Sequence, residues 1–208
     1  MSDSAREFVN RRALIGIGAA ALATSFSREA GAQSRAGLVE EVVGDGFAET
    51  GLARRSLSRD LPVFIADRVS TGEGSRLGLH LGSRTRVRMG ERTRLVIDRY
   101  LVDAGGEFTL ETGALLFDRQ RGSAPSPVQV RSPFALIAVR GTRFFAGPSA
   151  GVFGVFVARG VVTVSGGGGR VVLRQGEGTN IRFPGDVPSP PSRWGDPRIR
   201  AALASVSA

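Results

Sequence analysis

Apolar residues along most of this 208-residue chain recur with a period of two rather than the 3.6 of a helix. Leu77-Gly78-Leu79-His80-Leu81 alternates strictly, and similar patterns follow in 84–89, 94–97 and 107–110. A period of two places alternate side chains on one face of a sheet. Turn signals rich in glycine return roughly every 8–12 residues, as in sandwiches. The pattern predicts an all-β, mostly antiparallel single domain, built as a sandwich or as solenoid-like stacked sheets.

The second half of the chain adds longer apolar runs. Gly151–Val157 and Val161–Val164 flank Ala158-Arg159-Gly160, which reads as a turn between two strands. Arg170–Leu173 would then pair with Val161–Val164 across the glycine run at 166–169. Because these connections are short, antiparallel pairing is expected on both sides of Val161–Val164.

The N-terminus has the three parts of a bacterial export signal. Arg11-Arg12 precedes the short apolar run Ala13–Ala23, and Ala30-Gly31-Ala32 supplies a small-residue cleavage site. An arginine pair before a weakly hydrophobic run is typical of a twin-arginine signal, and a general secretory signal is the alternative. The run falls short of the ~20 apolar residues that span a bilayer. We therefore expect a helical signal over 1–32, a periplasmic mature protein and no stable membrane span after processing.

The C-terminal segment from 185 to 208 is rich in proline. Four prolines between 185 and 197 favour extended, poorly packed chain. Trp194 can nevertheless dock back on the domain, and Arg198–Val206 can form a short terminal helix. The expected organisation is therefore an export signal over 1–32, a β domain over 33–184 and a short Pro-rich tail over 185–208.

One ordered set of turns and strands distinguishes the middle of the chain. A Gly- and Thr-rich turn leads into an alternating strand, and a Ser-Pro step, an apolar strand, a Val-Arg-Gly-Thr end, a strand pair and a Gly-Glu turn follow. In chain order these are Ala66–Leu77, Ser132-Pro133, Ala135–Ala138, Val139-Arg140-Gly141-Thr142, Val152–Val164 with its Arg159-Gly160 break, and Gly176-Glu177.

This set resembles the FecR domain, over roughly Leu38 to Phe183. One departure is Leu81-Gly82-Ser83, where the family often has an acidic residue before Gly-Ser. FecR-type regulators place an anti-sigma segment in the cytoplasm, cross the membrane once and present this β domain outside to receive a signal from an outer-membrane transporter. This chain resembles only the outer part, so direct control of transcription is not expected.

The resemblance implies an exported, non-enzymatic binding or signalling-accessory module of the cell envelope. Its partner would be an envelope protein or a glycan, and no cofactor is implied. We interpret the motif residues as structural, because signatures of β domains consist mostly of turns and core positions. They are Pro133, Val139, Arg140, Gly141, Thr142, Gly160, Gly176 and Glu177.

Composition narrows the chemistry. The formal net charge of +9 comes from arginine alone, and these arginines alternate with apolar positions rather than clustering beside aromatic residues. This pattern disfavours nucleic-acid binding. The absence of cysteine excludes disulfides, zinc fingers and thiol nucleophiles. The single histidine, His80, has no evident co-ligand, so no metal site is expected.

Two other functions remain open at this point. A carbohydrate or cell-wall binding module would need exposed aromatic residues, for which Phe144, Phe145, Phe153 and Phe156 are the candidates. A carboxylate-dependent hydrolase would need two acids facing one cleft. The candidate acids are Asp98, Asp103, Glu107, Glu111 and Asp118.

Overall fold

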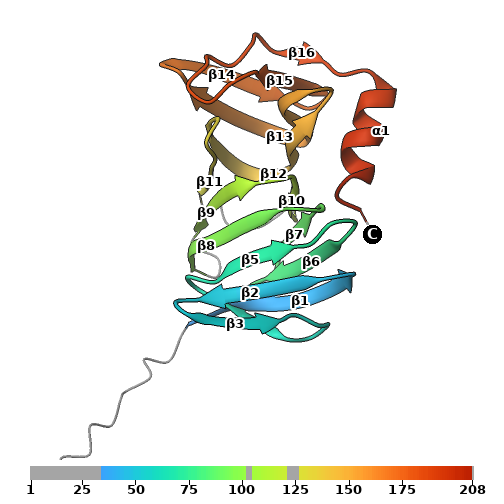
Figure 1. Cartoon of the computed structure of the whole chain (residues 1–208). Helices are drawn as coiled ribbons and strands as arrows, with labels where there is room; N and C mark the ends of the chain where they lie inside the picture. The colour runs from blue at the N-terminus through green and yellow to red at the C-terminus, as the bar shows by residue number, and fades with distance from the viewer. Residues whose placement is uncertain (1–33, 102–104, 121–126, 208) are drawn as a thin grey trace, which may run out of the picture. The chain divides into compact units, whose positions relative to one another are not determined.

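The computed structural model describes residues 34–101, 105–120 and 127–207. The predicted export signal therefore lies outside the described residues, including Arg11, Arg12, Ala30 and Ala32. The described residues form sixteen strands and one helix (Figure 1). This confirms the all-β, mostly antiparallel prediction. Among these residues, no helix is long and apolar enough to cross a membrane.

Most strands form two walls that face each other across one core. Phe108 of the first wall meets Phe117 of the second edge to face, with ring centroids 6.2 Å apart. Wall A contains, in spatial order, β3 (Ala53–Ser56), β2 (Gly46–Thr50), β5 (Arg68–Thr71), β8 (Arg94–Leu101), β9 (Gly105–Thr112) and β11 (Val128–Arg131). Wall B contains β4 (Pro62–Phe64), β1 (Arg35–Val43), β6 (Arg76–Leu81), β7 (Thr85–Met89) and β10 (Leu115–Arg119).

Two long strands join the walls. β12 (Leu136–Ser149) pairs through its first half with β11 and through its second half with β10. β13 (Val152–Gly166) follows β12 and bends at the same level. Its two halves then pair with β15 (Glu177–Ile181) on wall B and β14 (Gly169–Arg174) on wall A. These strands therefore close one end of the core.

The prediction that Ala158–Gly160 is a turn between two paired strands is wrong. Val152–Gly166 is one strand, and both of its halves pair with β12 rather than with each other. Gly160 has φ +88°, a conformation that favours glycine and bends the strand without reversing it. A glycine in a β pattern indicates either event, so the sequence did not distinguish them.

The connections between the walls lie on two sides of the core. On the arc side, the segments 44–45, 72–75, 90–93 and 113–114 carry the chain between the walls. On the corner side lie the bends at 140–142 and 158–160 and the turn at 175–176. Because β strands alternate in direction, each pass of the chain ends on one of these two sides.

Alternation of side chains fills the space between the walls. In β7, Thr85, Val87 and Met89 are buried, while Arg86 and Arg88 point outward. The same alternation buries Phe108, Phe117 and Phe144 almost completely. Burying one such large apolar side chain contributes roughly 1.5–3 kcal/mol. The period of two read from the sequence is therefore the main source of the core.

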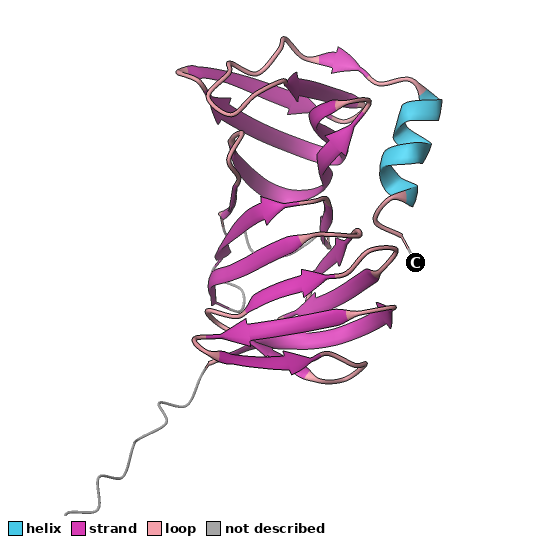
Figure 2. Cartoon of the chain, in the orientation of Figure 1, coloured by secondary structure: helices cyan, strands magenta, loops and turns pink. Residues whose placement is uncertain are grey.

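The Pro-rich tail is packed against the domain, which corrects the expectation of a poorly packed segment. Ser189 lies beside β15, where its carbonyl oxygen accepts a hydrogen bond from Thr179 Oγ1 at 2.7 Å. β16 (Ser192–Arg193) pairs with β15, and α1 (Asp196–Ala204) packs beside wall B (Figure 2). Extended conformation and close packing are compatible, because the tail follows an existing strand edge.

Trp194 explains why the tail docks. Its ring stacks on Phe156 with centroids 5.3 Å apart, and only 6% of the residue is exposed. The ring lies flat over Gly154 and Gly178, where a Cβ would come within 2.7 and 2.3 Å of ring atoms. The guanidinium of Arg198 covers it at 3.6 Å from the ring centroid. Burial lowers the pKa of Arg198, although a guanidinium remains charged at neutral pH.

Candidate functional site

The Val-Arg-Gly-Thr motif forms a corner of the fold. Gly141 has φ +60° and lies where β12 leaves wall A for wall B. Val139 and Thr142 on either side are buried, with 5% and 0% exposure. Gly160 lies against this bend, since a Cβ on it would stand 2.7 Å from Thr142 Cγ2. The two bends therefore pack on each other; both need glycine for conformation, and Gly160 needs it for space as well.

The other predicted motif residues are spread along the chain. Gly176, with φ +83°, forms the turn from β14 to β15, and Glu177 accepts a hydrogen bond from the Arg174 N–H at 2.8 Å. Pro133 is exposed on the arc side, in the turn between β11 and β12. The side chain of Arg140 is not among those described. The structure thus gathers Val139, Gly141, Thr142 and Gly160 but not Pro133.

An ion-pair cluster lies beside the corner. Asp118 on β10 accepts a hydrogen bond from Arg159 at 2.7 Å and lies 3.8 Å from Arg143 Nε. Arg159 also donates to the carbonyl of Arg119 at 2.7 Å. These contacts join β10, β12 and β13 where the strands change walls. Their arrangement ties the bends together.

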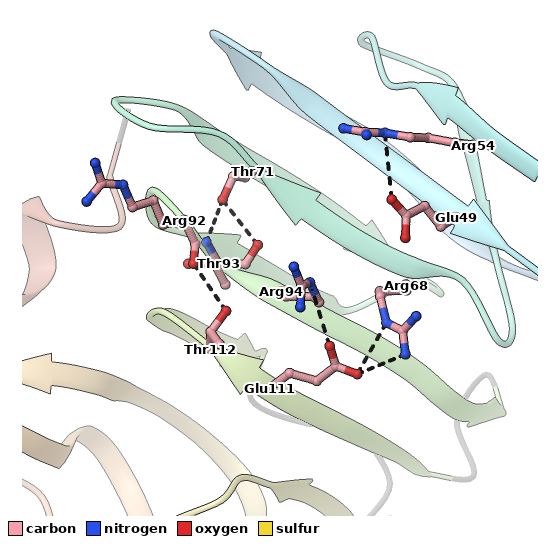
Figure 3. A network of polar contacts seen from close by, with 9 residues as sticks. All are labelled: Glu49, Arg54, Arg68, Thr71, Arg92, Thr93, Arg94, Glu111 and Thr112. Atoms are coloured by element: carbon pink, nitrogen blue, oxygen red, sulfur yellow. Dashed lines mark hydrogen bonds and ion pairs between the residues drawn. The ribbon is translucent and has the colours of Figure 1, made fainter.

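The described candidate acids point outward and are engaged by neighbouring side chains. Asp98 accepts a hydrogen bond from Thr109, and Glu107 pairs with Arg99. Glu111 is held by Arg68 and Arg94 on the outer face of wall A, as Figure 3 shows. Asp103 lies outside the described residues. No group of three or more potential metal ligands occurs in the part of the chain that the structure describes.

The candidate aromatic residues for a sugar platform are buried. Phe144, Phe145, Phe153 and Phe156 have between 0% and 6% of their surface exposed. Phe183 is 68% exposed and lies just after β15. A flat sugar-stacking surface made of the four candidates is therefore not present.

Most of the arc side is sealed by turns that bond to one another. The Gly72 N–H donates to the Asp45 carbonyl, and the Arg92 N–H donates to the Gly72 carbonyl, both at 3.0 Å. Thr93, linked to Thr71 in Figure 3, accepts a hydrogen bond through Oγ1 from the Ala114 N–H at 3.0 Å. These hydrogen-bonded connections thereby close the arc side of the core from segment 44–45 to segment 113–114.

The seal is interrupted at the level of β12. Here the walls carry separate turns, 132–135 on wall A and 150–151 on wall B, because the crossing lies on the corner side. A pocket of about 330 Å³ lies between these turns. Phe134 and Phe153 stack within its lining, with centroids 4.6 Å apart and planes 4° apart. We call it the aromatic pocket.

A second pocket adjoins the first. It has a volume of about 440 Å³ and shares Gly113 and Pro148 with the aromatic pocket. Its other lining residues include Arg76 and Ser205, which follows α1. We call it the helix-end pocket, and the two together the side groove. The two volumes give space for several side chains of an extended ligand.

Both pockets of the side groove carry an arginine with no acidic partner among the described residues. Arg182 lines the aromatic pocket, is exposed and makes no hydrogen bond or ion pair with any of them. Arg76 lines the helix-end pocket and donates only to the Ser75 carbonyl, while its Nε is buried without an acceptor. Arg92, by contrast, is committed to Glu73, whose hydrogen bond and charge raise the pKa of Arg92.

The groove therefore offers an apolar, aromatic cavity with a cationic group in each half. The two carboxylates of its lining are already engaged, Glu111 by Arg68 and Arg94 and Glu91 by the Gly74 N–H. This arrangement suits a ligand that has an apolar side chain and carboxylates, because carboxylates satisfy guanidinium donors. Sequence reasoning missed this site. Only a weak indication of it was visible in the sequence, namely prolines in the segments 132–134 and 147–148 that line the pocket with Phe134. These two segments come together only because β12 crosses between the walls at Gly141.

Comparison with known proteins shows which family model the domain matches. Residues 67–163 match the family model described as FecR protein, so the resemblance to the FecR domain is confirmed over this range. The matched range contains the Val-Arg-Gly-Thr corner and the bend at Gly160. No curated protein matches the chain.

The fold is also similar to that of a solved protein. Two crystal structures of a "putative anti-sigma factor" from Parabacteroides distasonis ATCC 8503, at 1.65 and 2.50 Å resolution, align with a TM-score of 0.55 and 19% identity. The alignments cover 65% of this chain and 64% and 63% of that protein. This chain therefore spans less than two thirds of that protein's length. At this identity, the likeness concerns the fold.

Proposed function

We propose that this protein is an exported, non-enzymatic FecR-type sensing module that binds an extended segment of a cell-envelope protein in the side groove. The aromatic pocket is the observation that carries the proposal. It opens toward the core at the level of β12, where the hydrogen-bonded connections of the arc side are interrupted. The FecR match over 67–163 and the fold of the anti-sigma factor support a regulatory sensing role. The export-signal pattern at 1–32 supports an envelope location.

The proposed ligand follows from the chemistry of the groove. One apolar side chain would enter beside Phe134 and Phe153, where burial in an apolar pocket is favourable. Carboxylates on the same segment would meet Arg182 at one end and Arg76 at the other. A protein segment supplies both features, whereas a neutral glycan would leave the two guanidinium groups without anionic partners.

Selection from random peptides displayed on phage tests this proposal with a defined probe. The full chain is the bait, and enriched peptides are synthesised and titrated against the unmodified protein. We expect sequences that combine a large apolar residue with Asp or Glu. Arg182→Gln and Phe134→Ser should each weaken binding at least about tenfold, which corresponds to about 1.4 kcal/mol.

Matched controls separate the groove from the general surface. Phe183→Ser removes an exposed phenylalanine outside the groove lining, and Arg35→Gln removes an exposed arginine on β1. Both should bind selected peptides as the unmodified protein does. Failure to enrich any peptide, or equal binding by the groove variants, would overturn the proposal. Binding of cell-wall sugar fragments that Arg182→Gln abolishes would assign the groove to a glycan instead.

A further inference from the structure

An unpaired sheet edge lies at β14, which forms one end of the core and lines neither pocket of the side groove. β14 pairs with β13 on one side and, among the described strands, has no neighbour on the other. An edge strand presents unpaired backbone groups that can pair with another chain. Whether an edge can do so depends on which backbone groups face outward and on what guards them.

The register identifies the groups that face outward. Gly167 and Gly168 both have positive φ and form a two-residue turn, so Gly166 and Gly169 are a hydrogen-bonded pair. Alternation then directs the backbone groups of 171 and 173 toward β13, and those of 170, 172 and 174 away from it. The bond from the Arg174 N–H to Glu177 Oε2 agrees with this assignment.

Two residues are left with free edge groups. No backbone hydrogen bond links the outward N–H and C=O of Arg170 or Val172 to another described segment. The other edges are better guarded. β4 has three residues and begins at Pro62, β16 has two, and β3 carries Arg54 and Arg55 on four residues. Short length, proline and charge are the usual means of blocking an edge.

The face beside this edge is apolar at its centre and basic around it. Val161 pairs with Arg174 and Val172 pairs with Thr163, so the two valines lie diagonally to each other on the outer face of β13 and β14, where they are 49% and 48% exposed. Arg131, Arg170 and Arg174 are exposed on the same outer face. The described parts of this face, 128–131, 136–139, 161–166 and 169–174, contain no Asp or Glu. The surface is thus complementary to an acidic partner.

We propose that β14 accepts an extended segment of an acidic protein partner as an additional strand. The segment's backbone would pair with Arg170 and Val172, and alternate side chains would be carboxylates beside Arg170 and Arg174. Main-chain pairing supplies affinity in such strand addition, and the side chains supply selectivity. A second copy of this chain fits less well, because its β14 brings the same positive charges.

A pair of designed peptides tests the proposal on the full chain. One peptide alternates valine with glutamate, and the other alternates valine with lysine. We expect the acidic peptide to bind at least about tenfold more tightly, and added salt to weaken it. Hydrogen exchange should show new protection at the amides of Arg170 and Val172. Equal affinity for the two peptides, or no protection at these amides, would overturn the proposal.

Two substitutions at one position separate backbone pairing from side-chain contact. Val172→Pro removes the outward N–H, which an edge strand tolerates, and should abolish binding of the acidic peptide. Val172→Thr keeps the N–H and should retain most of the affinity. Normal binding by Val172→Pro would contradict strand addition. Sedimentation that shows a dimer lost in Val172→Pro would assign the edge to a second copy and overturn the acidic-partner proposal.

This surface is tested independently of the side groove. Phe134→Ser and Arg182→Gln alter the groove and should leave binding of the acidic peptide at β14 unchanged. Conversely, Val172→Pro should not change the affinity of a peptide selected for the groove. Loss of one interaction therefore does not count against the other.

Discussion

The arc side and the corner side close the same core, but they do so with different sequence features. The corner side uses two bends at Gly141 and Gly160, which lie against each other and belong to the family motif. The arc side uses turns joined by hydrogen bonds, and it is left open at the aromatic pocket. The Val-Arg-Gly-Thr residues therefore mark how the chain folds, whereas the candidate site lies on the opposite side and includes only Pro133 of the motif residues.

The two sides are nevertheless physically linked. Because β12 and β13 change walls at the corners, the chain makes no crossing on the arc side at that level. The separate turns 132–135 and 150–151 are the direct result, and the aromatic pocket lies between them. The corner thus creates the opening without contributing a side chain to it.

The largest effect is expected at the tighter corner. In Gly160→Ala, a residue with a Cβ must adopt φ +88° and lies 2.7 Å from Thr142 Cγ2. Strain and overpacking together should lower the free energy of unfolding by about 3 kcal/mol. Thermal or denaturant unfolding measures this. The control is Gly151→Ala on the arc side, with φ +78° and open space, which should lose only about 1–2 kcal/mol. Equal losses would show that the contact with Thr142 is unimportant.

The sealed part of the arc side should come next. Thr93→Val removes the Oγ1 that accepts the hydrogen bond of the Ala114 N–H. Leaving this buried donor without a partner should lower the free energy of unfolding by about 2 kcal/mol. Urea denaturation of Thr93→Val and of Thr112→Val provides the check. Thr112 is exposed and its bond to the Arg92 carbonyl is long at 3.3 Å, so its loss should stay within about 0.5 kcal/mol. A full-sized loss in Thr112→Val would contradict this account of the seal.

The open corner position should give a smaller loss. Gly141→Ala introduces a Cβ with no atom within 4 Å, so only its φ of +60° is unfavourable. The expected loss is about 1–2 kcal/mol, and Gly141→Asn should lose less because asparagine adopts this conformation more readily. Comparing the two unfolding curves tests the origin of the effect. If asparagine destabilises as much as alanine, backbone conformation is not the cause.

The smallest effect on stability is expected in the groove. Arg182 is exposed and has no partner among the described residues, so Arg182→Gln should change the free energy of unfolding by less than about 0.5 kcal/mol. Its effect should instead appear in binding, as the tenfold loss expected for a groove-selected peptide. A large loss of stability in this variant would show that Arg182 supports the fold.

The sequence predicted the repeated units of the fold better than their connections. Alternation in 77–81 and 84–89 identified strands, because it reflects burial within one short segment. The bend at Gly160 was taken for a hairpin turn, since a positive-φ glycine serves either purpose. The tail docks because Gly154 and Gly178, which are far apart along the chain, leave space for the Trp194 ring. Prolines indicated extended chain correctly but said nothing about the edge it would follow.

The candidate site was harder to predict for the same reason. Phe134 and Phe153 were visible as aromatic residues in β-rich segments, but their stacking across the two walls results from pairings that span the whole second half. The Val-Arg-Gly-Thr motif was visible at once because its residues are adjacent. Local patterns therefore identified the corner, and only the assembled walls revealed the pocket.

The affinity of folded Gly141→Ala for a groove-selected peptide tests the central claim most directly. If the corner determines the fold and the groove determines binding, this variant should bind as tightly as the unmodified protein despite its lower stability. Arg182→Gln should instead keep its stability and, in the same titration, bind the peptide about tenfold more weakly. A tenfold loss of affinity in Gly141→Ala, at a temperature where the variant is fully folded, would contradict the account and make the corner itself a contact surface.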